Sequence, residues 1–328
     1  MAVRSIKPDR TNREESVSAL WRRLGIEEAA ARPLQSTLAA LDRYVDAGKA
    51  AQAGMCAMDV SRLSLLRWLH ERWEHQDQSL DLQSAFAYFY WGEELYLHQW
   101  QADGLDYDRH DDVLHELLSW QGLAAACGEA WFAHWIAPHL HNLFASGNVA
   151  KMGGEFVVDK AARLFTQQLQ SILISGVWPS VIDTEGLGAY APLIATASDP
   201  AGFKAALIDF CDYRVAQCFG YNGIDATKRR RPSEDGSIMD RGTWEQVLPV
   251  ELFTLKLAYE TSTHQVMDLN ADHPLLHTAL MQRPFPPLKP LLEDALTKRL
   301  SDLGQAVYKK EWTLLKPAPS LFLDAERK

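Results

Sequence analysis

Apolar residues recur along the first half of the chain at the spacing of amphipathic helices. In "SLLRWLHERW", Leu65, Leu69 and Trp73 follow one another at fourfold spacing. The segments "VLHELLSWQGLAAA" and "EFVVDKAARLFTQQLQSIL" repeat the pattern. Recurrence at i, i+3, i+4 and i+7 is typical of helices, and no convincing run shows the alternation of a strand. The pattern therefore predicts an all-α protein, built as a multi-helix bundle of antiparallel helical hairpins.

Helix-breaking residues cluster in two regions and suggest how the chain is organised. Gly, Pro, Ser and Asp interrupt residues 175–200, and a polar stretch over 220–242 has the composition of a long exposed loop. We predict a flexible N-terminus over 1–12, an N-terminal helical subdomain over 13–175 and a C-terminal helical subdomain over 176–328.

Two helix starts in the second half carry local signals. Asp199 followed by Pro200 predicts a start, because proline suits the first helical position. Thr243 and Gln246 fit a capping box for the next helix, and a start of this helix at Pro249 is the alternative.

The composition is that of a globular protein and does not indicate a particular function. Apolar residues make up 47% of the 328 residues, which is ordinary for a globular protein. No apolar run reaches the roughly 18 residues of a membrane span, and the first 16 residues lack the hydrophobic stretch of a secretory signal. The four cysteines form no CxxC pair, so neither a zinc ribbon nor a disulfide framework is indicated. We expect a cytoplasmic protein with reduced thiols.

The negative charge of the chain is concentrated in one stretch. From Glu71 to Glu116 there are twelve acidic residues and two basic ones, Arg72 and Arg109. This surplus of ten equals the whole net charge of −10, because the remainder holds 31 acids and 31 bases. Such a surplus repels nucleic acid and favours a basic partner. The alternative is a solvated acidic face that only keeps the protein soluble.

Within this stretch the segment "RHDDVLHELL", 109–118, allows two interpretations. Asp111, Asp112, His115 and Glu116 are residue types that bind metal ions. On a helical wheel, however, Asp112, His115, Glu116 and Ser119 lie opposite an apolar side, which predicts an amphipathic helix with its polar face outward. Asp108 would cap this helix, and Asp111 would lie in its first turn, where free amides favour an acid. We prefer the capped helix.

Two enzyme alternatives depend on a metal site in this segment. A di-iron bundle needs a second carboxylate-x-x-His pair on another helix, and none has suitable framing. A class I isoprenoid cyclase would resemble "DDVLHE", but "NLFASGNVAKMGGE" lacks the spacing of that family's downstream Mg²⁺ motif.

Other candidate residues carry weaker signals. His134, His139 and His141 fall in "WFAHWIAPHLHNLF" and could bind zinc, but packing of the histidines on aromatic side chains is the preferred interpretation. "KRRRP" at 228–232 could contact phosphates, but "SEDG" follows it directly, which favours a solvated loop. No phosphate-binding glycine loop, GxSxG or HExxH occurs.

The segment "LPVELFTLKLAYETSTHQVMDLNADHPLL", 248–276, resembles the C-terminal part of the immunity 49 family. Members of that family are bacterial proteins encoded beside polymorphic or contact-delivered toxins, which they neutralise. The resemblance covers about the last third of the chain. The residues that carry it are Leu248, Pro249, Glu251, Asp272, His273, Pro274 and Leu275. Their chemistry suits a helix start, a core face and a turn ended by proline.

The resemblance and the charge together lead to one expectation. We expect a cytoplasmic immunity protein that binds a cognate, basic toxin and has no chemistry, cofactor or metal of its own. Nucleic acid and membrane are not expected as direct partners. A helical metal-dependent enzyme using Asp111, Asp112 and Glu116 and a helical adaptor unrelated to toxins are the alternatives. The expected contact residues are Asp103, Asp106, Asp108, Asp112 and Glu116.

Overall fold

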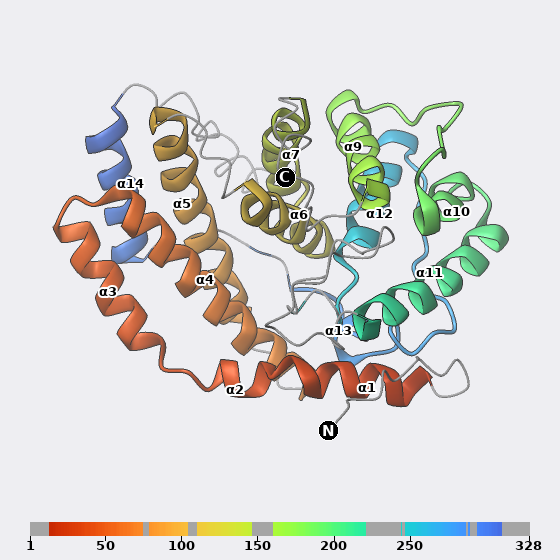
Figure 1. Cartoon of the computed structure of the whole chain (residues 1–328), viewed down its shortest axis with the longest axis horizontal. Helices are drawn as coiled ribbons and strands as arrows, with labels where there is room; N and C mark the ends of the chain where they lie inside the picture. The colour runs from red at the N-terminus through yellow and green to blue at the C-terminus, as the bar shows by residue number, and fades with distance from the viewer. Residues whose placement is uncertain are drawn as a thin grey trace. The chain divides into compact units, whose positions relative to one another are not determined.

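A computed structural model describes most of the chain, and it is helical. The described residues are 13–74, 79–103, 110–145, 160–220, 244, 247–286, 288 and 294–309. Over these ranges the regular elements are all helices, with no strand, which confirms the all-α class and the multi-helix bundle (Figure 1). In the part of the chain that the structure describes, no helix combines the length and the hydropathy that a membrane span requires.

The chain folds into two compact units that are each made of two separate stretches. Unit 1 comprises Met1–Leu24 and Tyr107–Phe285, and unit 2 comprises Gly25–Asp106 and Pro286–Lys328. The boundary predicted at 175/176 is therefore not a boundary between units. The breakers there open a loop inside unit 1, and contacts between segments distant in sequence define the units instead. The predicted flexible segment 1–12 and residues 221–242 of the predicted loop lie outside the described ranges.

Unit 2 is built around a pair of long helices, α4 and α5. Its helices are α2 (Ile26–Ala30), α3 (Leu34–Asp46), α4 (Ala50–Trp73), α5 (Ser79–Asp103) and α14 (Ala295–Tyr308). The two long helices lie side by side and run antiparallel (Figure 1), because Gly54 faces Gly92 while Ser61, further along α4, donates a hydrogen bond to the carbonyl of Ala85 at 2.7 Å. A Cβ atom on Gly54 would lie 2.9 Å from the carbonyl oxygen of Gly92, so glycine permits this close approach.

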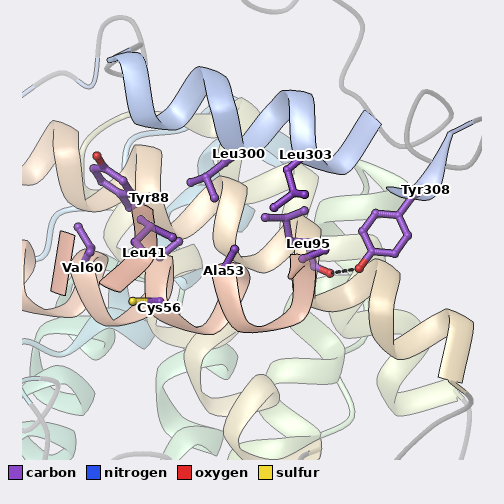
Figure 2. Packing of buried hydrophobic residues seen from close by; sticks show 11 residues of the cluster. Leu41, Ala53, Cys56, Val60, Tyr88, Leu95, Leu300, Leu303 and Tyr308 are labelled. Atoms are coloured by element: carbon purple, nitrogen blue, oxygen red, sulfur yellow. Dashed lines mark hydrogen bonds between the residues drawn. The ribbon is translucent and has the colours of Figure 1, made fainter. Parts of the chain in front are cut away.

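Helix α14 is attached to α5 at both of its ends. Asp294 caps α14 by accepting hydrogen bonds from the amides of Leu296 and Thr297, and its other carboxylate oxygen accepts one from the Tyr88 hydroxyl at 2.8 Å. At the far end the Tyr308 hydroxyl donates to the carbonyl of Leu95 at 3.2 Å (Figure 2). Between these ties lies an apolar core whose buried members include Leu41, Ala53, Cys56, Val60, Leu300 and Leu303 (Figure 2).

Unit 1 includes α6, whose second half is buried. Its longer helices are α1 (Arg13–Leu24), α6 (His110–Ala126), α7 (Ala130–Ala145), α9 (Lys160–Ser175), α11 (Pro200–Gly220) and α12 (Val250–Thr263), and its short ones are η2 (Gly188–Tyr190), α10 (Ala191–Ala195) and α13 (Ala279–Gln282). Helix α6 packs against both α7 and α12. The side-chain amides of Gln121 on α6 and Gln170 on α9 are both buried and exchange two hydrogen bonds, at 2.7 and 2.8 Å, so these buried polar groups satisfy each other.

The second half of α6 is buried on every side, which corrects the prediction of an outward polar face. Ser119, placed by the helical wheel on the solvent side, is only 1% exposed. Leu117 and Leu118 on one side and Gln121 on another are buried as well. The wheel shows which positions share a side, but it does not show how many neighbouring helices cover the element.

Two helices of unit 1, α11 and α12, begin at or directly after a proline. Helix α11 begins at Pro200, and an Asp199 carboxylate oxygen accepts a hydrogen bond from the Ala201 amide at 3.2 Å, which confirms that prediction. Helix α12 begins at Val250, immediately after Pro249, while Thr243 and Gln246 lie outside the described residues.

The contact between α6 and α12 leaves no room for a side chain at Gly122. An added Cβ at Gly122 would lie 2.6 Å from the Cβ of Val250, closer than real Cβ atoms approach each other. Replacing glycine by alanine at an unstrained helical position usually stabilises a protein, but here the two helices would have to separate. We expect Gly122→Ala to lower the free energy of unfolding by about 1–3 kcal/mol, measured by urea denaturation.

The matched control is Lys204→Ala on α11, also in unit 1. Lys204 is exposed and makes a 3.7 Å ion pair with the equally exposed Asp268, so its loss should change stability by less than about 1 kcal/mol. A Gly122→Ala protein as stable as the control would show that α6 and α12 do not make this close contact.

Candidate functional site

The acidic residues expected to bind a partner extend over both units. Asp103 is the last residue of α5 and Asp112 lies in the first turn of α6, and the side chains of both lie outside the described residues. Asp106 and Asp108 lie wholly outside them. Glu116, in the second turn of α6, is described and is half-buried. The structure therefore gives the positions of three of these residues on helices, and of the five side chains it describes that of Glu116.

Part of the acidic surplus is internal to unit 2. Glu93 and Glu94, in the middle of α5, are both buried, and so is Arg72 on α4. The ring nitrogen Nδ1 of His98 lies 2.7 Å from the carbonyl of Glu94 and 3.6 Å from its carboxylate. The Arg72 guanidinium lies over the ring of Trp68, 5.2 Å from its centroid. These charges belong to the packing of α4 and α5, so the acidic surface is smaller than the residue count suggests.

The residues considered as metal ligands lie on two helices, α6 and α7. The side chains of Asp111, Asp112 and His115 lie outside the described residues. Among the side chains that are described, no group of three or more His, Cys, Asp or Glu residues is arranged to hold a metal ion.

The histidines of α7 interact with their own helix. The Nδ1 atom of His134 is 2.6 Å from the carbonyl of Ala130, and His139 packs edge-on against Trp135 with ring centroids 5.3 Å apart. His141 is exposed. Packing on an aromatic neighbour, the preferred interpretation of the sequence, holds for His139.

The segment that resembles the immunity 49 family contributes a buried ion pair. Glu251, in the first turn of α12, accepts a hydrogen bond from the guanidinium of Arg214 on α11, and both side chains are buried. The second carboxylate oxygen of Glu251 has no hydrogen-bond partner among the described atoms. Glu251 also borders a cavity of about 10 Å³ together with Thr166 and Thr254. The sequence indicated a helix start at this position, but not the partner 37 residues away.

The Asp-His-Pro turn of the same segment is held from inside. His273 is 1% exposed, and its Nδ1 atom accepts a hydrogen bond from the amide of Leu275 at 3.1 Å. The proton of the neutral ring therefore lies on Nε2, which donates to a carboxylate oxygen of Asp212 at 3.2 Å. This burial leaves His273 no access to a partner and supports the interpretation of the turn as structural.

The Asp212 carboxylate also binds the first helix of the unit. Arg13 on α1 donates two hydrogen bonds to it, at 2.9 and 2.7 Å, in the bidentate geometry that suits arginine and a carboxylate. Burial alone would raise the pKa of Asp212, but the hydrogen bonds and charge of Arg13, with the hydrogen bond from His273, hold it below its usual value. Asp212 is therefore ionised near neutral pH and joins α1, α11 and the turn at His273.

An open groove in unit 1 was not indicated by the sequence. It has a volume of about 400 Å³ and lies between one face of α9 and the loop that follows it. Its apolar side is formed by Leu164, Ile172, Val177, Pro179, Val181 and Ile182. In "SGVWPSVIDTEG" one proline and two glycines predict a loop, and the aliphatic residues Val177, Val181 and Ile182 within that loop are the hint of a surface function.

Comparisons of the chain with protein-family models, with curated proteins and with solved structures each found no match. The immunity 49 resemblance thus depends on the residues of 248–276 alone.

The environment of His273 predicts acid sensitivity. Burial lowers the pKa of His273 below the ordinary value of 6.5, and the attraction of Asp212 offsets this only in part, while Arg13 and His277 lower it further. Protonation would also place a second N–H against the Leu275 amide. Below about pH 6.5 the unfolded state therefore binds a proton that the folded state does not bind, so stability falls as the pH drops below about 6.5.

We expect His273→Phe to remove this component of the pH dependence. At pH 7.5 the variant should be less stable by about 1–3 kcal/mol, because the Leu275 amide loses its acceptor and Asp212 loses a donor. Urea denaturation between pH 5 and 7.5 measures both effects. His141→Gln, a change at an exposed histidine of α7 in the same unit, serves as the control. Parallel pH profiles for wild type and His273→Phe would contradict the prediction.

The buried ion pair predicts strong non-additivity. Arg214→Met or Glu251→Leu alone leaves one buried charge without its partner and should lower the free energy of unfolding by about 3–5 kcal/mol. The double variant replaces both charges by apolar groups and should be more stable than either single variant. A double-mutant cycle in urea measures the coupling free energy. Single effects that simply add would show that the two charges do not depend on each other.

Proposed function

We propose that this chain is an immunity protein that binds a cognate toxin and occludes or distorts the toxin's active site, without chemistry of its own. The observation that carries the proposal is the placement of charge. All of the net charge of −10 is accounted for between residues 71 and 116. A toxin that acts on nucleic acid needs a basic surface, and an acidic inhibitor complements that surface.

The segment from 103 to 116 is the best part of this stretch for recognition. It contains six acidic residues within fourteen, and it runs from the last residue of α5 into the second turn of α6. Glu93 and Glu94, in the middle of α5, are buried and unsuited to meeting a partner. Segments that connect helices carry binding residues more often than helix interiors do, because their side chains reach solvent.

Segment 248–276, through its resemblance to the immunity 49 family, also supports an immunity function. Glu251 and His273 pack inside unit 1, where they contact Arg214 and Asp212. Residues with such roles belong to a scaffold that different proteins of one family could share. Specificity for one toxin would then be determined by other parts of the surface, and the acidic segment is available for this role.

Coexpression with the neighbouring gene is the direct test of this function. The chain should copurify with a basic protein encoded beside it and protect cells from that protein's toxicity. Elemental analysis of the purified chain tests the enzyme alternative at the same time. A tightly held metal ion that is lost in Asp112→Ala, together with no protection, would replace the immunity function by that of a metal-dependent enzyme.

Neutralising the acidic segment predicts a kinetic effect. We expect Asp106→Asn, Asp108→Asn and Asp112→Asn, combined in one protein, to slow association with the toxin by about tenfold or more at low salt. Single substitutions should do little, because an exposed ion pair contributes about 0–1 kcal/mol. The salt dependence of the association rate should fall as well, since salt screens the charges that have been removed. Stopped-flow kinetics over a range of salt concentrations measures both quantities.

A second triple variant separates local from overall charge. Glu27→Gln, Glu28→Gln and Asp302→Asn remove the same charge from exposed positions outside the acidic stretch. This control should associate nearly as fast as wild type. If the two triple variants slow association equally, net charge and not the 103–116 segment steers the encounter.

A further inference from the structure

An unusual amount of aliphatic surface is exposed where α9 ends. Ile174 is 51% exposed, Val177 63% and Val181 85%. Val177 and Val181 line the groove described above, and Ile174 lies on the last turn of α9. Single exposed apolar residues are common, but several grouped around a concave surface are typical of a binding site.

The loop that forms one side of the groove is fixed by contacts along its length. Gly176 turns the chain with a positive φ of 67°, and its amide donates to the carbonyl of Ile172 at 2.8 Å. Trp178 packs edge-on against Tyr259 of α12, with ring centroids 5.0 Å apart. The side-chain amide of Gln168 on α9 donates to the carbonyl of Asp183. These contacts shape the groove before any partner arrives, which reduces the loss of conformational entropy on binding.

The polar rim of the groove suits a polypeptide. Gln167, Gln168, Ser171 and Ser175 border the apolar floor. Ser171 donates its proton to the carbonyl of Gln167 and keeps its hydroxyl oxygen as an acceptor. The side-chain amide of Gln167 makes no hydrogen bond to a described residue. Uncharged amides and hydroxyls at the edge of an apolar floor match the alternating groups of a peptide backbone and its side chains.

The charge at the groove has one sign. Of the described residues that line it, Asp183 is the ionisable one, and it is exposed. Its carboxylate accepts a hydrogen bond from the amide of Glu185, which places a second exposed carboxylate two residues further on. Among the described residues that line the groove there is no lysine, arginine or histidine. A cationic side chain of a partner would be attracted here, and an acidic segment would be repelled.

We propose that this groove binds an apolar and basic segment of a protein partner, with an aliphatic side chain seated between α9 and the 177–183 loop and a lysine or arginine beside Asp183. The groove lies entirely within unit 1. The inference does not require the partner to be a toxin, so it stands or falls separately from the proposed function.

The test uses the full chain and three synthetic peptides with blocked ends. One peptide carries leucine and lysine in a Gly-Ser background, the second has glutamate in place of lysine, and the third has alanine in place of leucine. Methyl resonances of valine and isoleucine are followed by NMR during titration. The leucine–lysine peptide should shift Val177, Val181 and Ile182 and bind at least several-fold more tightly than either of the others.

Variants of the chain then identify the groups responsible. Val181→Ser should weaken the leucine–lysine peptide by roughly three- to tenfold, from the apolar contact that it removes. Val266→Ser should not, because Val266 is equally exposed, at 86%, but lies outside the groove. Asp183→Asn should bring the affinities for the lysine and glutamate peptides close together.

Three outcomes would overturn the proposal. The first is that no peptide shifts the groove methyls at millimolar concentration, or that all three bind equally. The second is concentration-dependent dimerisation in analytical ultracentrifugation that Val181→Ser abolishes, which would make the groove an interface between copies of this chain. The third is binding of isobutanol with the same shifts and no effect of Asp183→Asn, which would mark the groove as a site for small apolar molecules.

Discussion

Unit 1 depends on two charged residues of one helix, Asp212 and Arg214 on α11. A buried charge is tolerated only when a partner of opposite sign or a hydrogen-bond donor meets it, so each of these residues specifies the position of another segment. Asp212 determines where α1 and the turn at His273 must lie, through Arg13 and the imidazole. Arg214 does the same for the start of α12 through Glu251. Apolar packing alone would allow these segments to slide, whereas paired charges allow few alternative positions.

The elements themselves could be predicted from local sequence, because helices depend on local patterns. The recurrence of Leu65, Leu69 and Trp73 predicted a helix that became α4, and Asp199 with Pro200 marked the start of α11. Periodicity identifies the apolar face of a helix, however, and not what covers its other faces. It could not show that Ser119 is enclosed by further helices or that Glu93 and Glu94 lie inside unit 2. Those features depend on neighbours that are distant in sequence, and a local sequence pattern does not identify them.

Of the two candidate sites, the acidic stretch could be predicted from the sequence and the groove could not. The acidic surplus of 71–116 is a property of composition and was visible at once. The groove was not visible, since it arises only when Trp178 packs on Tyr259 and Gln168 bonds to Asp183. The ion pair between Arg214 and Glu251 joins residues 37 positions apart, and that between Arg13 and Asp212 joins residues 199 apart. No local pattern contains either pairing.

The acidic segment and the groove would have separate tasks in recognition. Charge acts over about 10 Å in ordinary salt, so the carboxylates of 103–116 would mainly raise the rate of encounter with a basic partner. An apolar side chain gains nothing until it is in contact, so the groove between α9 and the 177–183 loop would mainly slow dissociation. A partner that is basic overall and carries an aliphatic residue beside a cation would satisfy both surfaces. A basic protein without that residue would arrive as fast but leave sooner, and discrimination among basic partners would therefore depend on the groove.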